Sequence, residues 1–286
     1  MIYYLLFYNT AERKVFLKKY VSIFGDSIST LSGWNPKDYN VFYEGENCER
    51  SGVKDYSDTW WGQLIEYLEA NLLVNDSWSG SRVTKLPNYY RLFPSGISDE
   101  RINNLKKLHR NPDIIVIQLG VNDWGFGVDL LSQKPNGNER NKFVFRDAYS
   151  MMLEKLRSKY PKAQIYCVTL FSTYTPTEPV IHFPKVLYGN SIESYNKVIG
   201  EVASEYQCEV IDLHADKISI PTIDGSHPNK DGMTILAKLI ARGILSGDCL
   251  HLDCQTDHEY VQIGGDPRKR VLMCSQCGKI REEELS

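Results

Sequence analysis

Three residues that lie far apart in the sequence carry the side chains needed for nucleophilic acyl transfer. Ser27 follows an apolar run in VSIFGDSIST, and Asp224 and His227 stand three positions apart in DGSHPN. A serine hydroxyl attacks a carbonyl only when an adjacent base takes its proton, and an acid bonded to the other nitrogen of a histidine base fixes its tautomer. Asp26 and Ser27 also fit a helix cap. The hypothesis therefore depends on whether the fold brings His227 to Ser27.

The same reaction needs hydrogen-bond donors for the negatively charged oxygen of its tetrahedral intermediate, each worth about 3–4 kcal/mol when preorganised. Two further motifs supply candidates, because WSGS contains Gly80 and GVND contains Asn122. Glycine suits such a position, since the lack of a Cβ lets a substrate approach the backbone. We therefore expect an oxyanion hole made by the backbone N–H groups of Ser27 and Gly80 and the side-chain amide of Asn122.

Strand-like and helix-like segments alternate from residue 20 to about 246, and they must position these motifs. Apolar runs predict strands over residues 20–25, 72–77, 113–120, 164–170 and 209–213. Helical spacing predicts helices over residues 58–72, 98–110, 144–160, 191–206 and 229–245. Strands that are apolar on both faces and separated by helices indicate a parallel sheet covered on both sides. The carboxyl ends of such strands share one edge, where open α/β sheets bind their ligands, so the motifs are expected to meet there.

Four blocks in this order, FGDSIS, WSGS, GVND and DGSHPN, resemble those of the SGNH, or GDSL, hydrolase family over roughly residues 20–246. The resemblance implies a flavodoxin-like three-layer α/β/α sandwich. It also implies hydrolysis of carboxylic esters, short-chain acyl or acetyl esters on carbohydrates among them, through an acyl-enzyme on Ser27. Gly80 and Asn122 take the places of the family's oxyanion donors, and Asp224 and His227 those of its acid and base. The chain has no G-x-S-x-G motif, which argues against the α/β-hydrolase nucleophile elbow.

Two tryptophans flank the predicted oxyanion donors. Trp78 lies two residues before Gly80, and Trp124 lies two residues after Asn122. Flat aromatic faces at this edge suit a sugar ring or an apolar acyl chain, so both are candidates for substrate binding, with core packing as the alternative. No catalytic cofactor is required by the reaction.

Four of the seven cysteines crowd the last forty or so residues, which predicts a metal site in a reducing compartment, with the cytoplasm as default. The sequence CSQCG has the spacing of a zinc knuckle. The expected ligands of a structural Zn²⁺ are Cys254, His258, Cys274 and Cys277, with Cys249 and His251 as competing ligands. Residues 261–273 are predicted to form a small zinc-binding β-hairpin. The alternative is a disordered tail with incidental thiols.

Composition limits the remaining possibilities. The chain has 286 residues, which is enough for one sizeable domain. Its formal net charge of −3 gives no electrostatic argument for nucleic acid or a membrane as partner. We expect an N-terminal extension over residues 1–19, a hydrolase domain over 20–247 and a zinc-ribbon-like tail over 248–286. The expected partner is a small-molecule ester, with an acylated sugar as one candidate, and the oligomeric state stays open.

Two other functions are compatible with the same residues. One is a non-catalytic carbohydrate- or protein-binding protein of this fold, with an inert triad and the zinc ribbon as its interaction surface. The other is a hydrolase that uses the tail zinc for catalysis, which four protein ligands would disfavour because catalytic zinc keeps an open position. Covalent labelling of a nucleophilic serine separates the serine hydrolase from the non-catalytic protein.

Overall fold

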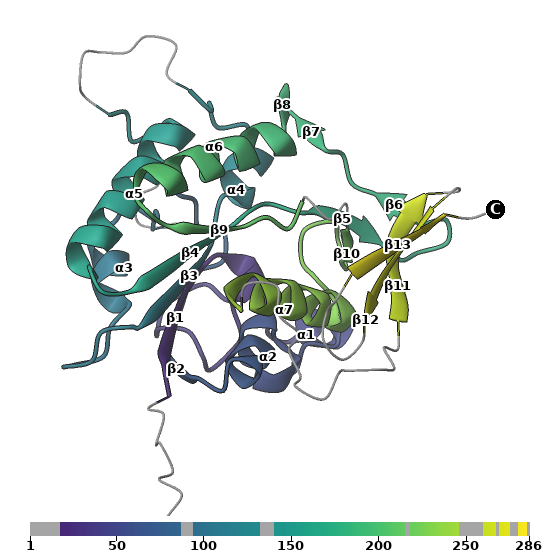
Figure 1. Ribbon diagram of the computed structural model, residues 1–286, viewed down its shortest axis with the longest axis horizontal. Coiled ribbons are helices and arrows are strands. Elements are labelled where there is room, and N and C mark those ends of the chain that lie inside the picture. Colours follow the sequence, from purple (N-terminus) through teal and green to yellow (C-terminus); the bar gives the residue numbers. More distant parts are fainter. Residues whose placement is uncertain are drawn as a thin grey trace, which may run out of the picture.

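The computed structural model describes residues 18–86, 94–131, 140–214, 218–245, 260–266, 269–274 and 280–284. Its central feature is a five-stranded parallel sheet with the strand order β2-β1-β3-β4-β9 (Figure 1). The strands are β1 (Tyr20–Gly25), β2 (Asn71–Ser77), β3 (Ile114–Gln118), β4 (Gln164–Val168) and β9 (Glu209–Ile211). In chain order this is 2-1-3-4-5, the order of flavodoxin-like doubly wound sheets.

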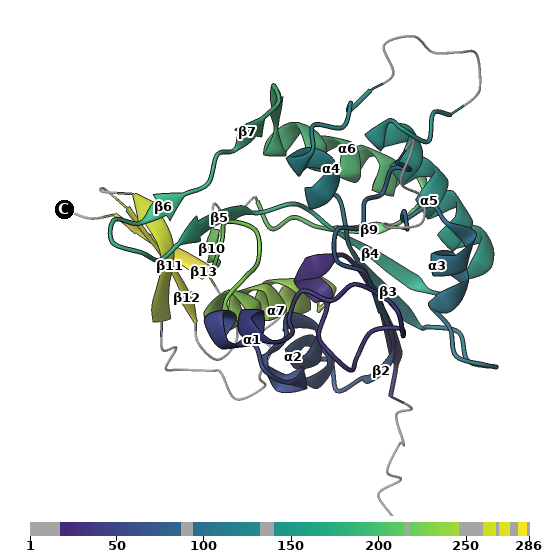
Figure 2. The ribbon, with the colours of Figure 1, turned by 180° about the vertical axis from the view of Figure 1, so that it is seen from behind.

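Helices cover both faces of this sheet, as the sequence predicted (Figures 1 and 2). The helices of the domain are α1 (Glu46–Ser51), α2 (Trp60–Tyr67), α3 (Asp99–Asn104), α4 (Val121–Gly125), α5 (Phe145–Lys159), α6 (Ile192–Glu205) and α7 (Lys230–Ile244). Successive residues of β3 point to opposite faces. Ile114 and Val116 pack in the cluster that holds α2 and α7, whereas Ile115 and Ile117 pack in the cluster that holds α3, α5 and α6. This two-sided burial explains why the strands are apolar throughout.

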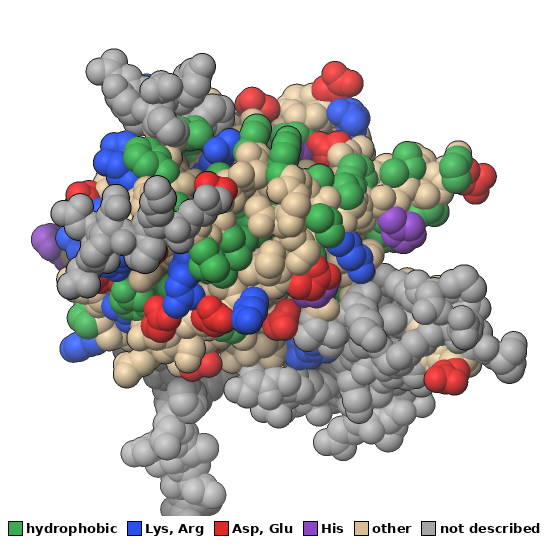
Figure 3. Space-filling model, turned by 90° about the horizontal axis from the view of Figure 1, so that it is seen from above, with side chains coloured by type: hydrophobic (Ala, Val, Ile, Leu, Met, Phe, Trp, Pro, Cys, Tyr) green, Lys and Arg blue, Asp and Glu red, His purple; other side chains and the backbone are tan. Residues whose placement is uncertain are grey.

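A smaller sheet lies beyond the carboxyl ends of the central strands. Its order is β10-β5-β6, formed by β5 (Ser172–Thr175), β6 (Ile181–His182) and β10 (Ser219–Pro221). The hairpin β7 (Val186–Leu187) and β8 (Asn190–Ser191) follows before α6. The segment that carries β6 exposes Val180 and Ile181. Exposed apolar side chains are seen on the face of the molecule shown in Figure 3.

The C-terminal segment forms a separate antiparallel sheet of order β11-β12-β13, with β11 (Tyr260–Asp266), β12 (Lys269–Cys274) and β13 (Ile280–Glu284). Strand β11 contacts β10. The predicted hairpin is therefore present as β11 and β12, and a third strand extends it. Within the described part of the chain, no helix is long and apolar enough to span a membrane.

Candidate active site

Ser27 lies at the start of a short turn directly after β1. The backbone of β1 ends at Gly25, and Asp26 caps the 3₁₀ turn η1 (Ser27–Ser29) by accepting a hydrogen bond from the Ile28 N–H at 3.1 Å. A Cβ at Gly25 would lie 2.6 Å from the Ser29 Oγ, so only glycine allows this close approach. Burial raises the pKa of Asp26 to about 7, and its Oδ2 has no hydrogen-bond partner among the described residues. This geometry matches the helix cap that the sequence suggested for Asp26.

The loop between β10 and α7 brings His227 to Ser27. The His227 Nε2 lies 2.9 Å from the Ser27 Oγ, and the His227 Nδ1 lies 2.7 Å from the Asp224 Oδ2. The other carboxylate oxygen, Asp224 Oδ1, accepts the backbone N–H groups of Ser226 and His227. The structure thus joins three residues from opposite ends of the domain in one hydrogen-bonded row.

Electrostatics favour an ionised Asp224 in this row. Burial alone would raise the pKa of Asp224, but the hydrogen bonds and charge of His227, with the Ser226 N–H, lower it to about 2. A carboxylate at neutral pH accepts only, so the His227 Nδ1 must be the donor to it. In a neutral imidazole, that leaves the Nε2 lone pair directed at the Ser27 hydroxyl.

The predicted oxyanion donors lie on the loops after β2 and β3. Gly80 adopts a φ of 81°, in the region that favours glycine, and its N–H has no acceptor in the described part of the chain. Asn122 lies in the first turn of α4 and donates one side-chain hydrogen to the Ser81 carbonyl at 2.9 Å, which leaves the second available. The buried Asp123 carboxylate accepts from the Val83 and Thr84 backbone N–H groups and so ties the two loops together.

A buried arginine that the sequence analysis did not single out holds the ends of β1 and β2 together. Arg101 on α3 is fully buried and pairs with Asp76, with 2.9 Å between Nε and Oδ2. It also donates to the Gly25 carbonyl at 2.8 Å and to the Ser81 Oγ. The turn that presents Ser27 and the loop that contains Gly80 therefore share one rigid support. In the sequence, Arg101 looks like any charged residue of a surface helix, so no signal marked it.

The ring of Phe42 covers one face of the His227 imidazole. The two ring centroids are 3.3 Å apart and the planes differ by only 7°. The Phe42 N–H donates to the Thr30 Oγ1, which itself donates to the Ser27 carbonyl. The neighbouring Tyr43 hydroxyl donates to the Pro228 carbonyl at 2.8 Å. The segment that contains Phe42 and Tyr43 is thus bonded both to the Ser27 turn and to the His227 loop.

The two candidate substrate-binding tryptophans are both partly buried. Trp78 packs on Tyr39, with ring centroids 4.0 Å apart. Trp124 packs against the core cluster of α5 and α6, and its indole N–H donates to the Asn190 carbonyl of β8. Both therefore have structural contacts, and their part in substrate binding stays a prediction.

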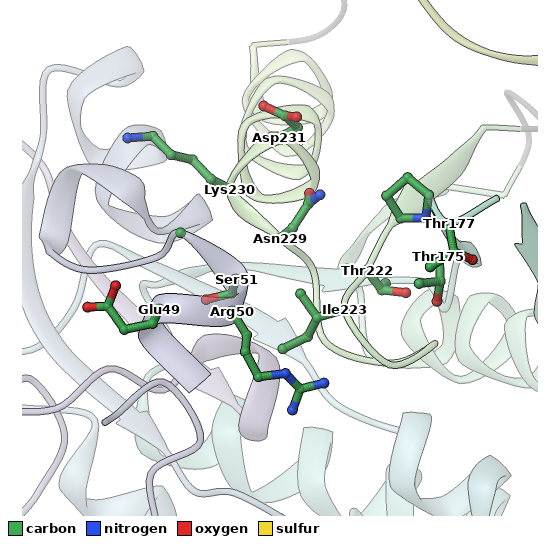
Figure 4. A pocket seen from close by; sticks show the side chains of 12 residues that line it. Glu49, Arg50, Ser51, Thr175, Thr177, Thr222, Ile223, Asn229, Lys230 and Asp231 are labelled. Carbon is green, nitrogen blue, oxygen red and sulfur yellow. The ribbon is translucent and has the colours of Figure 1, made fainter. Parts of the chain in front are cut away.

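A cavity of about 540 Å³ adjoins the loop that carries Asp224 and His227. Thr222, Ile223 and Asn229 lie at its centre, between α1 on one side and residues 175–177 on the other (Figure 4). Neither Ser27 nor His227 lines it. The cavity is a neighbour of the triad loop and not the site of the hydrogen-bonded row.

The predicted zinc ligands fall mostly outside the described residues. Cys254, His258 and Cys277 lie outside them, and Cys274 ends β12, where its Cα pairs with that of Tyr260. Within the described ranges, no group of three or more His, Cys, Asp or Glu side chains is placed to hold a metal ion. The structure therefore gives no support for the metal site.

Comparison with known proteins agrees with the four sequence blocks and the strand-edge geometry. The family model of GDSL-like lipases and acylhydrolases matches residues 19–244. The chain belongs to the GDSL-like lipase/acylhydrolase family. It is an enzyme of the GDSL esterase and acylhydrolase type, as the resemblance implied. The match ends at the last residue of α7, so the C-terminal sheet lies beyond the family domain.

Solved structures of this family share the fold. A GDSL-like lipase described from Bacteroides ovatus is 25% identical with a TM-score of 0.63, and the match covers 80% of this chain and 99% of that chain. One from Bacteroides uniformis is 27% identical with a TM-score of 0.62, over 80% and 96%. A carbohydrate acetylesterase from Sinorhizobium meliloti, 17% identical over 80% and 99%, has a TM-score of 0.51 and shows the fold alone. No curated protein matched the chain.

Proposed function

We propose that this GDSL-like enzyme hydrolyses carboxylic esters through an acyl-enzyme on Ser27. The observation that carries the proposal is the hydrogen-bonded row, in which 2.9 Å separates the Ser27 Oγ from the His227 Nε2 and 2.7 Å separates the His227 Nδ1 from Asp224. These are the contacts that a serine nucleophile, its base and the orienting acid require.

The reaction follows from this arrangement in two halves. The Ser27 Oγ forms a bond to the ester carbonyl carbon while the His227 Nε2 takes the hydroxyl proton. The carbonyl oxygen becomes negative and is stabilised by the N–H groups of Ser27 and Gly80 and by the Asn122 amide. The bond to the alcohol then breaks, and the alcohol leaves with the proton from His227. Water then attacks the acyl-enzyme while His227 takes its proton. The bond to the Ser27 Oγ breaks, the acid product leaves, and Ser27 regains its proton from His227.

The favoured substrates are esters of small acyl groups, with acetylated sugars as one class. This extension is supported by the names of two solved neighbours, a carbohydrate acetylesterase and an aryl esterase. Both are 17% identical to this chain, so they guide the choice of substrates to assay. A panel of acetylated sugars, short-chain acyl esters and aryl esters tests it.

The nucleophile is tested by Ser27→Ala. We expect kcat for 4-nitrophenyl acetate to fall about 10³-fold or more, because the removed oxygen forms the acyl bond, and labelling by a fluorophosphonate probe to disappear. Ser32→Ala, at an exposed serine five residues further on, is the matched control and should keep both the turnover and the fluorophosphonate labelling. Undiminished turnover in folded Ser27→Ala would exclude Ser27 as nucleophile. A folded wild-type chain that is neither labelled nor active would favour the non-catalytic binding protein.

A further inference from the structure

Arg82 lies beside the oxyanion loops, and no described residue forms an ion pair with it. It follows Ser81, whose carbonyl accepts the Asn122 amide, and lies two residues after Gly80. Its guanidinium carbon lies 4.2 Å from the centroid of the Phe126 ring. Phe126 directly follows α4, and the first turn of α4 holds Asn122. The guanidinium therefore flanks the two loops that carry the predicted oxyanion donors.

The Arg82 guanidinium is half-buried, yet in the described part of the chain it makes no hydrogen bond and no ion pair. Burial lowers the pKa of Arg82, and among the described residues the carboxylate that opposes this effect is Asp123. Asp123 is already bonded to Val83 and Thr84. A guanidinium has five N–H donors in a planar fork that suits carboxylate, sulfate or phosphate. At this half-buried position the donors are only partly hydrated, so an anionic ligand that takes them gains more than it would at a fully exposed arginine.

The surroundings of Arg82 leave a ligand free to approach. Phe126 is 62% exposed and Tyr188, from the β7–β8 hairpin, is 74% exposed. A Cβ at Gly127 would lie 2.7 Å from the Tyr188 ring, so the hairpin rests against the end of α4. Contact with the Phe126 ring restrains the Arg82 guanidinium and so reduces the conformational entropy that is lost when a ligand binds.

We propose that Arg82 binds an anionic group of the substrate beside the scissile ester. The inference rests on the proposed esterase function and narrows it to acidic esters. The anionic group belongs either to the acyl part or to the alcohol part of the ester, and the two sources are distinguished by experiment.

The test compares kcat/KM within two matched pairs of esters, after subtraction of the uncatalysed rate. In the acyl pair, mono-4-nitrophenyl succinate carries a carboxylate where 4-nitrophenyl butyrate has a methyl group. In the alcohol pair, 3-acetoxybenzoate is compared with its methyl ester. The readout is the ratio of kcat/KM for the charged ester to that for the neutral ester. We expect Arg82→Gln to lower this ratio about tenfold or more in one pair, with Arg82→Lys in between, because lysine keeps the charge without the fork.

Arg110→Gln is the matched control. Its guanidinium also lies 4.2 Å from an aromatic ring, that of Tyr20, but at the opposite end of β1 from Ser27. The Arg110→Gln enzyme should keep the wild-type ratio of kcat/KM for the charged ester to that for the neutral ester. A second measurement needs no variant: raising the salt from about 0.05 to about 0.5 M should lower the wild-type ratio in the same pair, because salt screens a partly exposed charge contact.

The outcomes separate this inference from the function on which it rests. Wild-type enzyme that hydrolyses the neutral esters but shows no salt-sensitive preference for a charged one refutes the role of Arg82 and leaves the esterase intact. A kcat/KM ratio that neither Arg82→Gln nor Arg82→Lys changes also refutes the role of Arg82 and leaves the esterase intact. If Arg82→Gln fails to fold, Arg82→Lys and the salt series decide. A folded wild type that hydrolyses none of the four esters and reacts with no fluorophosphonate overturns both proposals.

Discussion

At the scale of single residues, the orientation of the imidazole depends on a side chain with no reactive group. The Phe42 ring lies flat against His227, and Asp224 fixes one ring nitrogen. A hydrogen bond at Nδ1 still allows the imidazole plane to rotate about the bond axis. The aromatic face removes that freedom. The backbone of Phe42 is tied to the Ser27 turn through Thr30, so base and nucleophile are aligned by one loop.

We predict that Phe42→Ala lowers kcat for 4-nitrophenyl acetate about tenfold and changes KM little, because a stacked pair is worth about 0.5–1.5 kcal/mol and the lost contact orients the base. Phe42→Tyr should restore most of kcat, and Phe42→Leu less. A ring-current shift of the His227 carbon-bound protons in NMR spectra should appear in the wild type and vanish in Phe42→Ala.

Phe143→Ala provides the control, since Phe143 is 40% exposed and precedes α5. It should leave kcat and the His227 resonances unchanged. A Phe42→Ala enzyme that loses stability but keeps kcat and the His227 resonances would show that the stack only packs the loop.

The residues of the proposed catalytic row and oxyanion hole were recognisable from the sequence, whereas the residues that support them were not. Ser27, His227 and Asn122 stand out because acyl transfer needs those side-chain types at strand ends. Phe42 and Arg82 belong to residue types with many uses on loops. Only the three-dimensional contacts show that one lies against the imidazole and the other against Phe126.

At the scale of elements, strand pairing determines where α2 ends and β2 begins. Helical spacing predicted one helix over residues 58–72, but α2 ends at Tyr67 and β2 begins at Asn71. Asn71 pairs with Tyr20 of β1, and Glu69 adopts a φ of 47° in the turn between the two elements. Tertiary pairing thus overrides the helix propensity of this stretch. The other predicted strands and helices are present, with α3 shorter than expected because it ends at Asn104.

The layered architecture with a parallel sheet was predicted through the family resemblance, whereas the hairpins between β5 and α6 were not predicted. Short two-residue strands carry too little periodicity to be read from a sequence. These hairpins contact the site, because Phe183 packs against Gly225 between Asp224 and His227.

The buried pair of Arg101 and Asp76 joins elements, and its loss should unfold the edge of the sheet. We predict that Arg101→Met lowers the free energy of unfolding by about 3–5 kcal/mol, because a buried carboxylate is left without its partner. Urea unfolding followed by circular dichroism measures the change. Arg110→Met breaks an exposed pair with Asp113 and should cost no more than about 1 kcal/mol. Equal effects of the two changes would mean that Arg101 is not the support described here.

At the scale of the whole molecule, the catalytic fold and the C-terminal sheet are distinct parts of the chain. The family model ends at residue 244, and β11 begins at Tyr260. Tyr260 of β11 pairs with Cys274 of β12, and the neighbouring Met273 of β12 pairs with Ile280 of β13. The chain therefore enters β11 and passes from β12 to β13 at one end of the sheet. A metal ion at that end would fasten all three strands.

Zinc in the C-terminal segment is the prediction that belongs to this scale. A structural site of Cys254, His258, Cys274 and Cys277 should hold about one zinc per chain, measured by metal analysis of the purified protein. Replacing Cys274 and Cys277 by serine should remove the metal and make the C-terminal segment sensitive to limited proteolysis, because a small sheet with few large apolar residues depends on such a staple. Cys48→Ser, at a cysteine outside the segment, should retain the zinc and the protease resistance. Metal-free wild-type protein whose C-terminal segment already resists proteolysis would rule the site out, and the three strands would then be stable through their backbone pairing and their contact with β10.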